Sequence, residues 1–358
     1  MQRTRTIHSV TVGETECELQ HEPVSGSELT ARVGENLVVA YLVYDSGNDI
    51  EDLMGECMGK LLSFHRYSSD IAEGMRALGK TSDGDLDLDR VWNSHGEEAA
   101  KRYLAKVRKD YSFRDVRERL NDAGIISWEG ALSMLSDEID VVSNWDRVEY
   151  ENEMEEVLYQ MWAEPEFFPG DPDAQVLACY EHGGQHWSLS GQGPQDRWDT
   201  SNFAGVWVPD SNLREELDTV APTAARAFVR GVGKSYQLVH VLWEDDEPTI
   251  VKLELYDDAS ALWGKARRIA ESQKAPTPRQ IAWGRAQMAE IYCQQFLDTY
   301  NDIISGRVYG CVVETFDQSG VRIDEDACWG YVGDWAEEAL KTEFFEPACE
   351  ASMGVEHV

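Results

Sequence analysis

Three side chains able to support catalysis or metal binding lie close together in the sequence. Cys179, His182 and His186 are of the types that ligate transition metals or act as nucleophile and base in hydrolases. The pair Gly183-Gly184, between two runs of strand-forming residues, predicts a hairpin with a two-residue turn. In that register Glu181 pairs with His186. Because side chains alternate between the faces of a strand, Cys179, Glu181 and His186 are predicted to share one face, and His182 the other.

The predicted hairpin, over 176–190, has two interpretations. The trio Cys179, Glu181 and His186 would form an enzyme site, as a hydrolase or with a metal ion. The alternative is a packed hairpin with one polar cross-strand pair. The stretch 187–210 is rich in tryptophan and glycine. That composition is typical either of a small β core with tight turns or of an aromatic binding platform.

Two other patterns are incomplete versions of known ligand sites. The segment Gly231-Val-Gly-Lys-Ser235 ends like a phosphate-binding loop, but Phe228 stands where that loop requires its first glycine. The segment Asp83-Gly-Asp-Leu-Asp-Leu-Asp89 lacks the central glycine and the closing glutamate of a calcium loop. We therefore expect neither a bound metal ion nor a cofactor.

Charge is the most unusual property of the chain. Its 358 residues include 67 acidic and 32 basic side chains, for a net charge of −35. Fifteen of the acids fall within 120–175, where Arg147 is the one base, so this segment alone carries −14. The preceding segment, 101–119, holds eight basic and three acidic residues. Electrostatic repulsion disfavours direct binding to nucleic acid or to an anionic membrane.

The clustered acids predict a specific surface. A predicted helix over 146–162 places carboxylates on one face at intervals of about 5–6 Å. Such a row resembles the regularly spaced phosphates of duplex DNA, so we predict a DNA-mimicking surface that occupies the basic cleft of a nucleic-acid-binding protein. The alternative is an ordinary solvated face, partly neutralised by the basic segment 101–119. The predicted contact residues are Glu149, Glu151, Glu153, Glu155 and Glu156, with Asp137, Glu138 and Asp140 as neighbours.

The ends of the chain and its cysteines indicate a location. The first 30 residues contain no apolar segment of the kind found in secretory signals, and no run of 18 apolar residues occurs. Seven cysteines are scattered without Cys-x-x-Cys pairs, which favours free thiols in a reducing compartment. We expect a cytoplasmic protein.

Periodicity and turn residues predict an α+β fold with a helix-rich N-terminal half, a β-hairpin-rich middle and a C-terminal helix–hairpin–helix unit. The predicted domains are 1–164, with an acidic helical region over 120–164, and 176–358, which is β-rich. Three prolines predict a linker over 165–175 between them. The predicted helices cover 97–120, 131–142, 146–162, 278–305 and 334–345, and the predicted strands cover 35–44, 176–182, 185–190, 205–209, 236–243, 249–256 and 308–314, with a partner running towards 329.

Several segments together resemble a family of largely hypothetical proteins encoded by bacteriophages and integrative elements. The resemblance is carried by Cys179-Tyr-Glu-His-Gly-Gly with Trp187-Ser-Leu-Ser-Gly, Arg197-Trp-Asp-Thr, Val206-Trp-Val-Pro-Asp210, Val308-Tyr-Gly-Cys-Val-Val-Glu314 and Ala327-Cys-Trp-Gly-Tyr331. It implies a mobile genetic element as the setting, and such elements encode proteins that counter host defences. It implies no catalytic residues.

The implied genetic setting and the charge together favour one function, and two alternative functions remain open. We expect a phage or mobile-element anti-defence protein, an acidic DNA mimic that inhibits a host nucleic-acid-binding defence complex of restriction or CRISPR type through protein–protein interaction. The first rival is the enzyme built on the 176–190 hairpin. The second is an interaction scaffold whose acidity only aids solubility.

Overall fold

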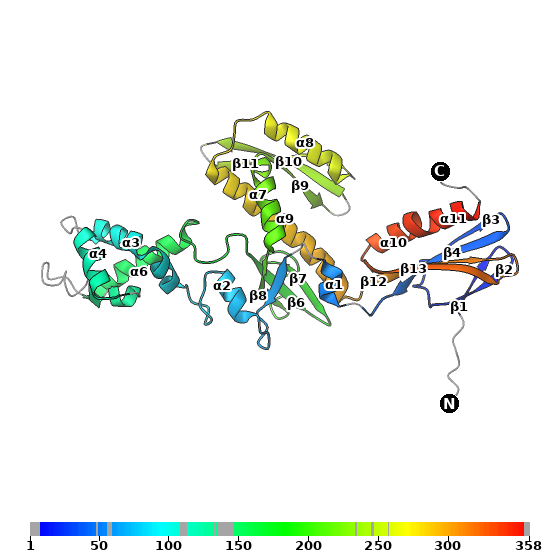
Figure 1. The fold of residues 1–358 in the computed structure, drawn as a ribbon, viewed down its shortest axis with the longest axis horizontal. Helices are drawn as coiled ribbons and strands as arrows, with labels where there is room; N and C mark the ends of the chain where they lie inside the picture. The colour runs from blue at the N-terminus through cyan, green and yellow to red at the C-terminus, as the bar shows by residue number, and fades with distance from the viewer. Residues whose placement is uncertain are drawn as a thin grey trace.

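The computed structural model is a mixed α+β fold with several antiparallel sheets. The ribbon is elongated, with a group of helices at one end, a sheet formed by both chain ends at the other, and two further sheets near the middle (Figure 1). The α+β class is confirmed. The helix-rich N-terminal half is corrected, because the chain begins with strands. The structure describes residues 8–47, 49–55, 59–107, 113–125, 127–131, 133–134, 147–232, 235–244, 247–256 and 258–353.

The two ends of the chain form one unit, which we call the terminal unit (residues 8–44 and 308–353). Its four-stranded sheet has the order β13-β12-β4-β3, with Tyr41 opposite Val312. Branched and aromatic side chains make β4 a central strand buried along most of its length. The strands are β1 (His8–Val12), β2 (Thr15–Leu19), β3 (Leu29–Val33), β4 (Asn36–Tyr44), β12 (Val308–Phe316) and β13 (Arg322–Val332).

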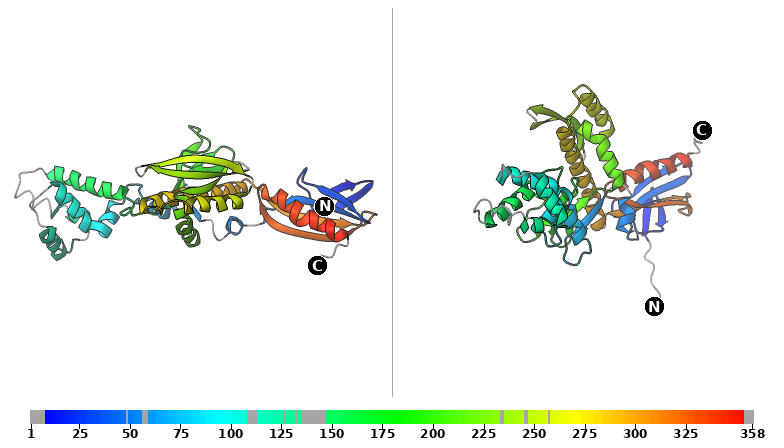
Figure 2. Two further views of the ribbon diagram at one scale, coloured as in Figure 1. Left: turned by 90° about the horizontal axis from the view of Figure 1, so that it is seen from above. Right: turned by 60° about the vertical axis from the view of Figure 1, so that its left-hand side comes forward.

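Apolar layers cover both faces of this sheet. On one face Ala40 and Val313 pack against the C-terminal helices, which lie along the sheet (Figure 2). On the other face Val39 and Val312 pack against the β1–β2 hairpin. The predicted helix over 334–345 is longer than expected and continues to Ser352. It consists of α10 (Trp335–Ala339), a π-helical segment (Leu340–Phe345) and α11 (Glu346–Ser352).

The predicted division into domains 1–164 and 176–358 does not follow the sheets. Strand β4 pairs with β12, and β5 (Lys60–Ser63) pairs with β8 (Thr200–Val208). Each pairing joins a strand before the expected boundary to a strand after it. Pairing between distant strands leaves no trace in local composition, so a boundary drawn from prolines misses it.

Helix α9 (Pro278–Ile304) organises the middle of the molecule. It begins as predicted, with Thr277 and Gln280 forming a capping box. Its apolar residues Met288 and Phe296 share a core with Trp207 of the sheet β5-β8-β6-β7. The third sheet is β11-β10-β9. The remaining elements here are α1 (Ile50–Met54), α2 (Ile71–Ala77), β6 (Gln175–Glu181), β7 (Gln185–Leu189), α7 (Ser211–Ala224), β9 (Ala227–Val232), β10 (Ser235–Glu244), β11 (Glu247–Tyr256) and α8 (Ala259–Glu271).

Helices form the far end of the molecule, among them α3 (Leu88–Val107), α4 (Phe113–Asp122) and α6 (Arg147–Ala163) (Figure 1). Tyr103, Met154 and Leu158 are fully buried in the core that they share. The described parts of the predicted helix over 97–120 are helical, and this helical region begins at Leu88, nine residues earlier than expected. Most of the predicted helix over 131–142 lies outside the described residues.

The predicted linker over 165–175 is a packed segment and not a free connection. Asp173 is only 1% exposed. Its carboxylate accepts from Arg285, with Nε to Oδ1 at 2.6 Å and Nη2 to Oδ2 at 2.7 Å, and from Arg214 Nη1 at 3.3 Å. Asp171 also binds Arg214. The prolines shape the turns, and these ion pairs fix the segment to α7 and α9.

Candidate functional site

The hairpin that carries the predicted enzyme site has a different register from the one expected. Glu181 lies opposite Gln185, Cys179 opposite Trp187, and Tyr180 opposite His186. The loop therefore contains three residues, 182–184, and its central glycine has a φ of 75°. A glycine in this left-handed conformation is typical of three-residue hairpin loops.

The shift of one residue separates the predicted trio. His186 lies on the opposite face of the hairpin from Cys179 and Glu181, because a slip of one position exchanges the faces of a strand. Cys179 is 4% exposed, and burial together with the charge of Glu181 raises the pKa of its thiol to about 11. The thiol is thus protonated near neutral pH, which does not suit a nucleophile. Among the described residues no group of three or more His, Cys, Asp or Glu side chains could hold a metal ion.

Cys179 and Glu181 instead line a cavity of about 540 Å³, which we call the aromatic cavity. Its aromatic lining comes from two strands, two loops and helix α9. Trp198 is 85% exposed and Phe203 is 43% exposed, so two large rings are presented to solvent at this site. The indole N–H of the buried Trp187 has no hydrogen-bond partner within the described part of the chain. The aromatic lining residues are Phe64, Trp187, Trp198, Phe203 and Tyr300.

The carboxylates of the aromatic cavity are engaged by an amide and an imidazole. Gln185 Nε2 donates to Glu181 Oε1 at 2.7 Å, and His182 Nδ1 lies 2.9 Å from Asp199 Oδ2. No lysine or arginine is among the described residues that line the cavity. The site therefore combines aromatic faces with negative charge. The aromatic platform that the composition of 187–210 indicated is its closest sequence signal.

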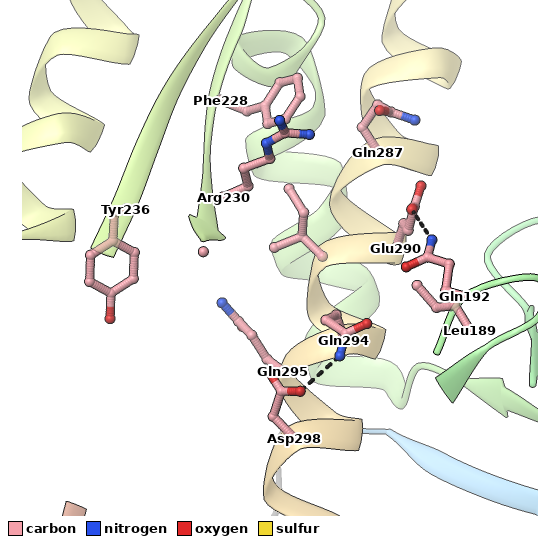
Figure 3. Close-up of a pocket in the computed structure, with 12 residues that line it drawn as sticks. Leu189, Gln192, Phe228, Arg230, Tyr236, Gln287, Glu290, Gln294, Gln295 and Asp298 are labelled. Carbon is pink, nitrogen blue, oxygen red and sulfur yellow. Dashed lines mark hydrogen bonds between the residues drawn. The ribbon is translucent and has the colours of Figure 1, made fainter. Parts of the chain in front are cut away.

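A second cavity, of about 690 Å³, lies between α9 and the β9–β10 hairpin (Figure 3). Gln192 Nε2 donates to Glu290 Oε1 at 3.1 Å, and Gln294 Nε2 donates to Asp298 Oδ1 at 2.8 Å. Arg230 faces the same space from β9. This lining mixes carboxamides with charges of both signs, unlike the aromatic cavity. Sequence reasoning did not find it, because its residues come from three separated segments.

The acidic face predicted on α6 is partly paired inside the helical unit. Glu155 and Glu156 are exposed, whereas Glu151 and Glu153 are half-buried. Lys106 Nζ of α3 lies 2.5 Å from Glu156 Oε2, and this hydrogen bond raises the pKa of Lys106. The basic segment thus neutralises part of the face, as the alternative interpretation expected. Asp137, Glu138, Asp140 and the side chain of Glu149 lie outside the described residues.

The terminal unit presents a second acidic surface that sequence reasoning missed. It holds 17 acidic side chains against three basic ones, which are Arg32, Arg322 and Lys341. Six of the acids precede residue 45 and eleven follow residue 307, so only the pairing of β4 with β12 brings them together. We call the following set the terminal acidic surface. Its members are all exposed: Asp324 and Asp326 on β13, and Glu337, Glu338, Glu343, Glu346 and Glu350 on the C-terminal helices.

None of the helices within the described ranges combines the length and apolar character that crossing a membrane would require. Comparison with protein-family models, with curated proteins and with solved structures gives no match.

Proposed function

We propose that the protein is an anti-defence inhibitor of a mobile genetic element, which binds a host nucleic-acid-binding complex of restriction or CRISPR type through an acidic, DNA-like surface. The observation that supports this most directly is the terminal acidic surface, where seven exposed carboxylates are accompanied on the helices by the single base Lys341. The net charge of −35 acts in the same direction, because it attracts a basic partner from a distance.

The spacing of these carboxylates suits a cleft that normally holds nucleic acid. From Glu337 to Glu350 the helix advances by about 20 Å at 1.5 Å per residue. Five carboxylates with four intervals over that length lie on average about 5 Å apart along the axis, compared with ~3.4 Å per phosphate of one DNA strand. A groove lined with lysine and arginine to contact phosphates would meet a similar row of anions here.

The helix is also a rigid support for this row. Leu340 and Phe344 are buried against the sheet, so the opposite side of the same helix faces solvent. Glu343 is positioned further by the hydroxyl of Tyr331, which donates to its Oε2 at 3.2 Å. Such a surface changes little on binding, which limits the entropy lost when the complex forms.

A competition assay tests the proposal. Purified restriction and CRISPR effector complexes are loaded with fluorescent duplex DNA, and its displacement by the protein is measured at low and high salt. We expect displacement at low salt that falls steeply as salt rises, because paired charges on both partners are screened and counterions are no longer released.

Two matched variants locate the surface. Replacing Glu343, Glu346 and Glu350 by glutamine should weaken displacement. The control replaces Glu244, Glu247 and Glu271, which are exposed elsewhere, and makes the same change in net charge. Equal displacement by the two variants would show that net charge alone matters, and the absence of displacement by the wild-type protein from every complex tested would contradict the proposed function.

A further inference from the structure

The aromatic cavity has the features of a binding site for a flat cation. Its volume of about 540 Å³ lies within the usual range for ligand pockets. Phe64 and Phe203 pack with ring centroids 4.8 Å apart, and Trp198 projects beside them with most of its surface in solvent. Exposed apolar side chains that gather in one patch, unlike those scattered singly over a surface, mark binding sites.

The charge inside the cavity determines whether it favours a cation or an anion. Glu181 and Asp199 are both engaged by neutral or weakly basic groups, namely an amide and an imidazole. Since no lysine or arginine of the described lining offsets them, an anion such as a phosphate would be repelled. A cation would gain from both carboxylates and from the electron-rich faces of the rings.

The geometry favours a guanidinium over an ammonium ion. A planar guanidinium stacks on aromatic faces and can donate two parallel hydrogen bonds to one carboxylate, whereas an ammonium ion acts as a compact point charge. Two guanidinium groups of the chain itself stack on aromatic rings close to the cavity. The guanidinium carbon of Arg197 lies 5.4 Å from the ring centroid of Trp198, and that of Arg66 lies 4.5 Å from the ring centroid of Tyr67.

We propose that the aromatic cavity binds an arginine side chain presented by the basic partner protein. This inference rests on the proposed function, because a cleft that binds nucleic acid is rich in arginine. The terminal acidic surface would attract the partner by charge, and the cavity would hold one arginine by stacking and hydrogen bonds. A buried aromatic–arginine contact of this kind is typical of the few residues that dominate an interface.

The test uses a probe that does not require the partner. N-acetyl-arginine methylamide is titrated into the full-length protein, and binding is followed by ligand-observed NMR and by calorimetry. The neutral citrulline analogue, which has nearly the same shape, serves as the comparison. We expect the arginine probe to bind with a Kd at least about tenfold lower than that of the citrulline probe.

Variants identify the groups responsible. Trp198→Ala should lower the affinity for the arginine probe roughly tenfold. The double variant Glu181→Gln, Asp199→Asn should lower it by a similar factor. The matched control is Trp335→Ala, which removes a tryptophan that is 60% exposed on α10 and should leave the affinity unchanged. Circular dichroism shows whether each variant is folded.

The outcomes separate this inference from the proposed function. Equal binding of both probes, or unchanged binding in folded Trp198→Ala, would overturn the cavity as an arginine site. Loss of probe binding by Trp198→Ala with fully retained displacement of duplex DNA would overturn its role in holding the partner. Binding of the probe by a wild-type protein that displaces no duplex would instead count against the inhibitor proposal alone.

Discussion

The side-chain amide of Asn301 forms two hydrogen bonds with the main chain of Trp187. The Trp187 N–H donates to Asn301 Oδ1 at 2.8 Å, and Asn301 Nδ2 donates to the Trp187 carbonyl oxygen at 2.8 Å. Strand β7 is at the edge of its sheet, so these groups have no neighbouring strand on that side. One residue of α9 thus takes the place of a strand and fixes the hairpin that lines the aromatic cavity.

We expect Asn301→Ala to lower the free energy of unfolding by about 1–3 kcal/mol, because it leaves a partly buried N–H and carbonyl without partners. Urea denaturation monitored by tryptophan fluorescence measures the change. Asn202→Ala, at an exposed position of β8, is the control and should have little effect. A loss in Asn301→Ala no larger than in the control would show that water satisfies the Trp187 groups equally well.

A second expectation concerns the buried carboxylate of Asp173. It receives the guanidinium of Arg285 and one bond from Arg214, so its removal leaves Arg285 without its buried counterion, while Arg214 keeps its ion pair with Asp171. We expect Asp173→Ala to cost about 3–5 kcal/mol, as for other broken buried ion pairs. Asp218→Ala removes the exposed partner of the same Arg285 and should cost less than about 1 kcal/mol. Similar losses in the two variants, measured by thermal and urea unfolding, would contradict this ranking.

Local signals in the sequence accounted for some elements and not for others. Helix α9 was predicted to within one residue, because Thr277 caps it, Pro278 starts it and Gly306 follows its end. The terminal unit was not predicted, since β4 and β12 are more than 250 residues apart and nothing near either strand identifies its partner. The packing of the predicted linker over 165–175 was missed for a related reason. Its prolines are visible in the sequence, but the arginines that hold Asp173 come from α7 and α9.

The candidate site shows the same limit at a finer scale. The pair Gly183-Gly184 correctly predicted a hairpin, and Cys179 and Glu181 do lie on one face. The sequence did not distinguish a two-residue from a three-residue loop, and this single position moved His186 to the other face. The Trp- and Gly-rich composition of 187–210 was typical of either a small β core or an aromatic platform, and the ring partners Phe64 and Tyr300 that complete the cavity come from distant elements.

Thiol accessibility gives a third expectation. The protein tested carries the substitution Cys57→Ser. In this variant, Ellman's reagent at pH 8 should label the exposed Cys328 rapidly. Cys179 should react much more slowly, because it is 4% exposed and its pKa is raised to about 11. Mass spectrometry of timed samples identifies the labelled residue. Labelling of Cys179 as fast as that of Cys328 would revive the interpretation of Cys179 as a reactive nucleophile.

The raised pKa of Cys179 also predicts a pH dependence of stability. Burial and the charge of Glu181 hold the pKa at about 11 in the folded protein, above its value in the unfolded chain. The folded state therefore binds this proton more tightly. The resulting stabilisation is complete below about pH 8.5 and is lost as the pH rises towards 11.

Comparison with Cys179→Ala isolates this contribution from other groups that titrate at high pH. The substitution adds a constant change in packing energy and removes the ionisation. We expect the difference in unfolding free energy between wild type and variant to shrink by up to about 3 kcal/mol between pH 8 and pH 11. A difference that stays constant over this range would show that the thiol ionises equally in both states.

The last expectation compares the two acidic surfaces. On α6, Glu156 is paired with Lys106 and Glu153 is half-buried, so part of the negative charge is already satisfied within the protein. Replacing Glu149, Glu151, Glu153, Glu155 and Glu156 by glutamine should therefore lower stability only slightly, by the loss of the exposed Lys106 pair. The same variant should weaken displacement of duplex DNA less than the three substitutions at Glu343, Glu346 and Glu350.

The reason is the balance of acidic and basic residues on each surface. The helix from α10 to α11 carries five exposed glutamates and one lysine, whereas α6 faces the basic residues of α3. Screening by salt acts on both surfaces alike. The salt dependence of displacement should therefore fall mainly in the variant in which Glu343, Glu346 and Glu350 are replaced by glutamine. The slope of the logarithm of the binding constant against the logarithm of salt concentration measures it. A larger drop in slope for the α6 variant would place the partner on the helical unit, as the sequence first predicted.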